Sequence, residues 1–189
     1  ADVLTWSGEA WIGGDVNRIW FKTEGDAADG EVGDAEIQAL WSRNIADFWD
    51  LQAGVRVDLE PDATTYLTLG VQGLAPYRFE TEAAAFLSED GDISARLHQS
   101  FDIHLTQRLI AEPHAEINAY AQDVPERDIG AGFSDAEIGL QIRYEVTRKF
   151  APYVDLVWES ALGETASIAR ANGEDVRSES VRAGVRFWF

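Results

Sequence analysis

The chain contains three histidines, His98, His104 and His114, and neither cysteine nor methionine. Imidazole and carboxylate side chains suit Cu(II) or Zn(II), whereas the soft thiolate and thioether ligands that favour Cu(I) are absent from this sequence. All three histidines fall in two neighbouring segments that we predict to be strands, 93–105 and 109–121, joined by a short turn near 106–108. Candidate metal chemistry is therefore confined to one predicted hairpin.

Folding this hairpin about its turn brings histidines close to carboxylates. Directly opposed residues of antiparallel strands have β-carbons about 4.5–5.5 Å apart. The expected neighbours are His104 with Glu112, His114 with Ser100 and Asp102, and His98 with Glu116. The candidate metal ligands are thus His98, His104, His114, Asp102, Glu112 and Glu116.

One metal ion reaches only part of this set. His98 and His104 lie six positions apart, which is about 20 Å along a strand that rises roughly 3.3 Å per residue. At most His98 with His114, or His104 with His114, serve one ion. The alternative is that these polar side chains pair with one another and hold no metal. Ser100 beside His114 is the one Ser–His pair that the folding gives, in a generic neighbourhood, so we expect no enzyme activity.

The elements that carry these residues show strict alternation of apolar and polar side chains, which is typical of strands. In 135–144, for example, Ile138, Leu140 and Ile142 alternate with charged or small residues. We predict ten strands, at 4–24, 34–43, 48–58, 64–74, 78–88, 93–105, 109–121, 134–145, 150–160 and 178–189. The apolar parity changes at Gly13-Gly14, and we interpret this change as a bulge inside one long strand. A hairpin at that point is the alternative and adds a strand.

No segment has the roughly 18–20 apolar residues that a membrane helix needs, but a barrel strand needs apolar residues only at alternate positions. The polar face of nearly every predicted strand contains charged residues. This favours a barrel in which the polar faces line the interior and the apolar faces contact lipid. Aromatic residues near strand ends favour membrane interfaces. We predict an all-β fold, a closed antiparallel transmembrane β-barrel of about ten strands (alternatives eight or twelve), as a single domain over 1–189. A soluble β-sandwich is the alternative.

The connections are of two lengths. Those near 44–47, 75–77, 106–108 and 146–149 are short, and those at 25–33, 122–133 and 161–177 are long and polar. Short periplasmic turns and longer extracellular loops are typical of outer-membrane barrels. Pro113 lies inside a predicted strand and removes a hydrogen-bond donor, so we expect a bulge or a local gap there.

Charge and composition exclude several functions. The chain has 15 Lys and Arg against 34 Asp and Glu, a net charge of −19, which disfavours nucleic acid as a partner. The absence of cysteine excludes disulfides and thiolate zinc sites. The absence of an initial methionine suggests that the chain begins after a removed segment. A second polar cluster contains Asn17, Arg18, Lys22, Glu24, Glu9 and Trp11. We interpret it as ion pairing that helps to close the barrel, and a path for copper ions is the alternative.

Several segments resemble the bacterial copper-resistance protein B family. They are GEAWIGGDVNRIWFKTEG at 8–25, FWDLQAGVR at 48–56, LGVQGLAPY at 69–77, LTQRL at 105–109, FAPY at 150–153 and AGVRFWF at 183–189. The resemblance implies an outer-membrane protein of copper tolerance that is encoded alongside periplasmic copper proteins, which are candidate partners. Family members generally carry an N-terminal stretch rich in Met and His, which this chain lacks.

The resemblance leads to the following functional expectations. We expect a protein of the bacterial outer membrane, surrounded by lipid, that binds, sequesters or passes copper ions at the cell envelope. The runner-up is a structural barrel that anchors a missing Met-rich copper-binding segment. An outer-membrane enzyme is a third and distant possibility.

Overall fold

The computed structural model describes residues 3–28, 31–60 and 63–187, and these residues form twelve strands and one α-helix. The strands are β1 (Val3–Gly13), β2 (Asn17–Ala28), β3 (Glu31–Ala46), β4 (Trp49–Glu60), β5 (Thr64–Ala75), β6 (Phe79–Ser88), β7 (Ile93–Ser100), β8 (Ile103–His104), β9 (Leu109–Tyr120), β10 (Gly132–Tyr144), β11 (Phe150–Ala161) and β12 (Arg177–Phe187). The helix α1 (Gly163–Asn172) joins β11 to β12. Short 3-10 turns follow β5 at Pro76–Arg78 and β9 at Pro125–Arg127.

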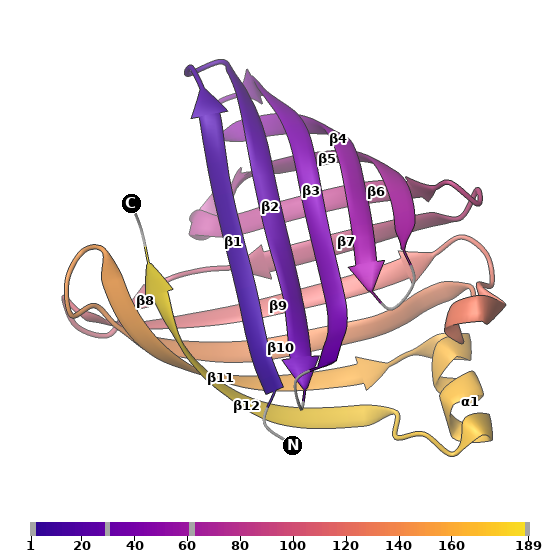
Figure 1. Cartoon of the computed structure of the whole chain (residues 1–189). Coiled ribbons are helices and arrows are strands. Elements are labelled where there is room, and N and C mark those ends of the chain that lie inside the picture. The colour runs from indigo at the N-terminus through magenta and orange to yellow at the C-terminus, as the bar shows by residue number, and fades with distance from the viewer. Residues whose placement is uncertain (1–2, 29–30, 61–62, 188–189) are drawn as a thin grey trace. The chain divides into compact units, whose positions relative to one another are not determined.

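The chain divides into two compact units, each described by itself. Unit 1 comprises 1–73 and 83–95, and unit 2 comprises 74–82 and 96–189. In unit 1, β1 to β5 pair antiparallel in chain order. In unit 2, β9 to β12 do the same, and β8 pairs with β9. Figure 1 shows β1, β2 and β3 side by side in unit 1.

The strand count of twelve is one of the two alternatives predicted beside ten. One extra strand comes from a hairpin that separates β1 from β2, where a bulge was predicted. Gly13 adopts φ 145°, and a β-carbon there would lie 2.4 Å from the Asn17 carbonyl oxygen. Gly14 N–H donates to that same oxygen at 3.0 Å. The parity changes because the chain reverses direction, so the predicted bulge was wrong.

The second extra strand comes from the gap that separates β7 from β8 opposite Pro113. Phe101 N–H donates to the Pro113 carbonyl oxygen at 3.3 Å, but proline has no N–H to return the bond. On its other side Pro113 pairs with Leu140 without a register shift. The predicted local gap is confirmed, and it falls on the β7–β8 side.

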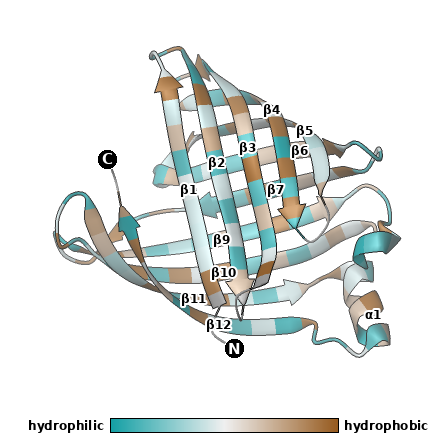
Figure 2. Ribbon diagram, viewed as in Figure 1, coloured by the Kyte–Doolittle hydropathy of each residue, from teal (hydrophilic) through white to brown (hydrophobic). Residues whose placement is uncertain are grey.

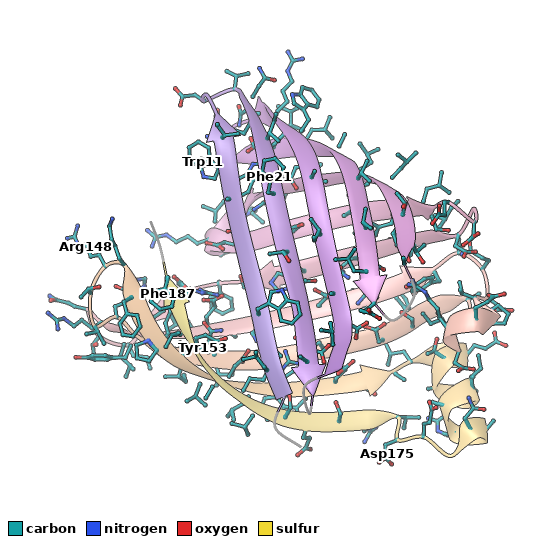
Figure 3. All side chains as sticks on the ribbon, in the orientation of Figure 1. Trp11, Phe21, Arg148, Tyr153, Asp175 and Phe187 are labelled. Atoms are coloured by element: carbon teal, nitrogen blue, oxygen red, sulfur yellow. The ribbon has the colours of Figure 1, made fainter. Side chains whose placement is uncertain are left out.

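The predicted connections are partly corrected. The segment predicted as a long loop at 25–33 is largely strand, since β2 extends to Ala28 and β3 begins at Glu31. The long connection predicted at 122–133 is confirmed between β9 and β10. The one at 161–177 contains α1, a helix that the alternation did not indicate. Figure 3 shows Arg148, in the short turn between β10 and β11, and Asp175, beside α1, at opposite ends of unit 2.

The two faces of the strands have opposite environments. On β10, Arg143 is only 5% exposed and Gln141 8%, whereas Ile138 is 62% exposed. Unit 1 follows the same rule, with Gln52 buried and Leu69 on the surface. Figure 2 shows the alternation as bands along the strands. A soluble sandwich buries its apolar face, so this arrangement contradicts the sandwich alternative.

Several aromatic side chains lie on the exposed face, where the predicted interfacial belts would place them. Trp41, Trp158 and Phe187 are each more than two-fifths exposed. Phe21 extends from β2 near the hairpin that joins this strand to β1 (Figure 3), and it is 51% exposed. Trp188 and Phe189, which end the predicted strand 178–189, lie outside the described residues. Within the described part of the chain, no helix has the length and apolar character needed to cross a membrane.

Candidate functional site

The first part of the site joins β7 to β9 through His98. Its Nδ1 lies 3.5 Å from Oε2 of Glu116, as the folded hairpin predicted. Arg96 Nε also approaches Glu116, at 3.4 Å. Asn118 donates to the same carboxylate at 3.1 Å and to Asp135 at 2.9 Å. Glu116 is therefore held by a cation, an amide and an imidazole at once.

The second part surrounds His114, which is 11% exposed and lies on β9. Its Nε2 lies 3.1 Å from Asp155 on β11, and its Nδ1 lies 3.7 Å from Glu137 on β10. Arg182 on β12 pairs with Glu137 at 3.5 Å.

Gly139 of β10 lies opposite His114. Because glycine has no side chain, the imidazole of His114 fits beside it.

The two imidazoles stack, with ring centroids 6.3 Å apart and an interplanar angle of 25°. We call His98, His114, Glu116, Glu137 and Asp155 the histidine cluster. No group of three or more His, Asp and Glu residues in the described part of the chain is already arranged around a metal position. The cluster consists instead of imidazole–carboxylate pairs at 3.1–3.7 Å.

Two predicted ligands, Asp102 and Glu112, bind an arginine. Arg143 bridges both carboxylates, donating to Asp102 at 2.9 Å through Nη1, with further contacts to Asp102 and Glu112. Arg186 approaches Glu112 at 3.1 Å. These four residues form what we call the arginine cluster. Their carboxylates are neutralised by guanidinium groups.

His104 is placed apart from the other histidines. In β8 it pairs with Ile110, two positions away from the predicted partner Glu112. It is exposed, and no contact joins it to the histidine cluster among the described residues. The hairpin register explains this, because Ile103 faces Ala111 and the pairing is shifted by two positions from the one that would join His104 to Glu112.

The prediction considered a single hairpin, so it did not include Glu137 and Asp155 among the candidate ligands. Both lie on the predicted polar face of their strands, and this parity was the available signal. Their strands follow β9 in the chain, and β10 lies between His114 and Asp155. Only the register of three strands shows that Asp155 reaches His114.

The polar face of unit 1 contains a different network. Arg56 pairs with Glu36 at 2.8 Å and Asp58 at 2.6 Å, and its guanidinium lies over the rings of Tyr66 and Phe86. The second predicted cluster lies on this face too. Arg18 approaches Asp50 at 3.7 Å and the Trp11 ring at 5.0 Å, and Lys22 donates to Gln72 at 3.3 Å. These contacts are one ion pair, one cation–π contact and one hydrogen bond.

Comparisons with known proteins identify first the class and then the family. A solved structure of the NanC porin aligns with 99% of this chain and 94% of its own, with a TM-score of 0.64 and 10% sequence identity. The chain therefore has the fold of a porin-type β-barrel. It belongs to the copper resistance protein B family, since the family model described as copper resistance protein B precursor (CopB) matches residues 1–189.

Curated relatives agree with this family. Copper resistance protein B of Escherichia coli is 45% identical over 187 residues, and the copper resistance protein B homolog of Pseudomonas syringae pv. tomato is 41% identical over 187 residues. Each match covers 98% of this chain. The chain spans 63% and 64% of the length of these relatives.

Proposed function

We propose that this chain is an outer-membrane β-barrel of copper resistance and that it binds or passes copper ions along the polar face of unit 2. The family match over residues 1–189 carries the copper part of this proposal. The porin-like fold and the exposed apolar face support the membrane location. Lipid around the barrel and periplasmic copper proteins as partners belong to the same proposal.

The ligand chemistry favours Cu(II) at the histidine cluster. Neither Met nor Cys is present, so the cluster offers imidazole and carboxylate, which suit Cu(II) better than Cu(I). Metal–imidazole and metal–carboxylate bonds are about 2.0–2.2 Å long, as measured for zinc. Two ligand atoms on one ion are then roughly 3–4 Å apart. The imidazole–carboxylate separations of 3.1, 3.5 and 3.7 Å already lie in this range.

A Cu(II) ion therefore needs little rearrangement to replace the proton between an imidazole and its carboxylate. His114 offers two such positions, one toward Asp155 and one toward Glu137. His98 and Glu116 offer a third. The three carboxylates make the cluster attractive to a cation, and Arg96 and Arg182 offset part of their negative charge.

Copper titration with matched variants tests the site. We expect the double variant His98→Ala, His114→Ala to bind Cu(II) at least about tenfold more weakly than the unaltered chain, measured by calorimetry in detergent. His104→Ala is the control and keeps its affinity, because His104 has no contact with the cluster. Unchanged stoichiometry and affinity in the double variant would refute a copper site here.

The relatives are longer than this chain, which favours a second candidate function. In that alternative the barrel is an anchor and copper is bound by another segment of the whole protein. The titration separates the two if the E. coli relative is measured alongside. Copper binding by the longer protein alone favours the anchor, and equal binding by both favours the barrel.

We propose no catalytic role. Both ring nitrogens of His114 face carboxylates, so neither is directed at the hydroxyl of Ser100. A nucleophilic serine needs a base within hydrogen-bond reach. Hydrolysis of lipid esters by the purified chain would contradict this part of the proposal.

A further inference from the structure

A cavity of about 550 Å³ lies in unit 2 where the chain passes from β11 through α1 into β12. Leu162, Ala166 and Val176 contribute apolar surface to it, and Arg170, Arg177 and Asp175 contribute charges. It contains no member of the histidine cluster. Pockets for small ligands are typically about 300–1,000 Å³, so the volume accommodates a compact ligand.

Hydrogen bonds fix the walls of this cavity. Ala161 N–H donates to Val176 at 2.9 Å and Leu162 N–H donates to Ser134 at 2.8 Å, which holds both ends of the connection to the sheet. Gly130 N–H donates to the Thr165 hydroxyl at 3.0 Å. Gly173 closes α1 with φ 80° and donates to the Arg170 carbonyl oxygen at 3.2 Å. The backbone that carries the two arginines is therefore well defined.

The charge of the cavity differs from that of the chain as a whole. The chain has a net charge of −19, but the cavity has two guanidinium groups and one carboxylate. In the described part of the chain, neither Arg170 nor Arg177 forms an ion pair. Guanidinium groups bind phosphate through paired, charge-assisted hydrogen bonds. A copper ion has the wrong sign for this cavity.

We propose that this cavity binds a phosphate group attached to a ligand with an apolar portion, with Arg170 and Arg177 as the phosphate ligands. Leu162, Ala166 and Val176 contact the apolar portion. Asp175, beside α1, lies at the end of unit 2 opposite the short turn at Arg148 (Figure 3). Long connections of outer-membrane barrels face outward, where phosphorylated lipid headgroups and free phosphate are both available. This inference goes beyond the proposed copper function and does not depend on it.

The test compares two variants that remove the same charge. Arg170→Ala with Arg177→Ala alters the cavity, and Arg148→Ala with Lys149→Ala alters the opposite end of unit 2. Binding of the full chain in detergent is measured with inorganic phosphate by calorimetry. Binding of phosphorylated lipid A, with dephosphorylated lipid A as the blank, is measured by its co-purification with the full chain in detergent. We expect the cavity variant to bind at least about tenfold more weakly and the control to stay within about twofold.

The two probes identify the source of the phosphate. Binding of inorganic phosphate alone indicates a free anion, and binding of phosphorylated lipid A alone indicates a lipid headgroup. Asp175→Asn gives an independent check, because removing the one acidic side chain should strengthen phosphate binding several-fold. The proposal is overturned if the unaltered chain binds neither probe, or if the cavity variant binds as well as the control. Copper titration of the same variants keeps this result separate from the proposed function.

Discussion

Units 1 and 2 follow one rule of strand alternation but use their polar faces differently. In unit 1, Arg56 is enclosed by two carboxylates and two aromatic rings, and no histidine is present in the unit. In unit 2, Arg143 has a similar role at one position, but imidazoles and carboxylates occupy another. Ion pairs alone are thus sufficient to fill such a face. The histidine cluster is an addition, which is why we place the candidate copper chemistry there.

Substitution of the central arginine of each unit, Arg56 or Arg143, should have the largest effect on stability. We expect Arg143→Ala and Arg56→Ala each to lower the free energy of unfolding by about 3–5 kcal/mol, because each removes a largely buried guanidinium that two carboxylates share. Urea unfolding of the refolded protein in lipid vesicles measures this. A loss below about 1 kcal/mol in either unit would mean that water replaces the arginine there, and the two faces would no longer be equivalent.

The exposed faces should respond alike in the two units. Ile138→Arg in β10 and Leu69→Arg in β5 place a charge on side chains that are 62% and 58% exposed. If both faces contact lipid, each change costs about 2–4 kcal/mol near the membrane midplane. Asp90→Arg in the β6–β7 turn is the control and should stay within about 0.5 kcal/mol. A small effect at only one site would show that this unit faces water there.

One glycine in each unit leaves space for a neighbouring group, and the two neighbours differ. A β-carbon at Gly139 would lie 2.1 Å from His114 Nε2, whereas one at Gly54 would lie 2.0 Å from the backbone oxygen of Ala39. An imidazole can rotate away, but backbone must shift. We expect Gly54→Ala to lose about 1–3 kcal/mol of stability without changing Cu(II) affinity. Gly139→Ala should lose less stability but weaken Cu(II) binding about tenfold, roughly 1.4 kcal/mol. Equal copper affinity in both variants would argue against His114 as a ligand.

The smallest effect is expected for an exposed pair in unit 1. Arg18 and Asp50 are 3.7 Å apart and their side chains are 30% and 22% exposed. Asp50→Asn should cost about 0.2–1 kcal/mol, and the difference should shrink as salt is added. Unfolding at low and high salt measures it. The Arg143 contacts are more buried, so their contribution to the free energy of unfolding should change little with salt. A larger salt dependence for Arg143 than for Arg18 and Asp50 would contradict this comparison.

Local errors in the prediction have local causes. The Gly13-Gly14 step allowed either a bulge or a turn, because both change the parity of the following residues by one. Helix α1 was missed because its sequence has small residues and no strong apolar periodicity, and packing of Ala166 and Ala169 stabilises it. The strands on either side of residues 29–30 extend farther than their composition suggested, since antiparallel pairing continues there.

The sequence by itself determined the strands, their two faces and the pairing of His98 with Glu116, because side-chain direction alternates along a strand and a short turn limits the register of a hairpin. Only the tertiary structure decided that Asp155 and Glu137 reach His114, that Arg143 takes up Asp102 and Glu112, and that His104 lies apart. Those contacts depend on the registers of several strands combined. A shift of two positions in one of them keeps every face unchanged but gives each side chain a new neighbour.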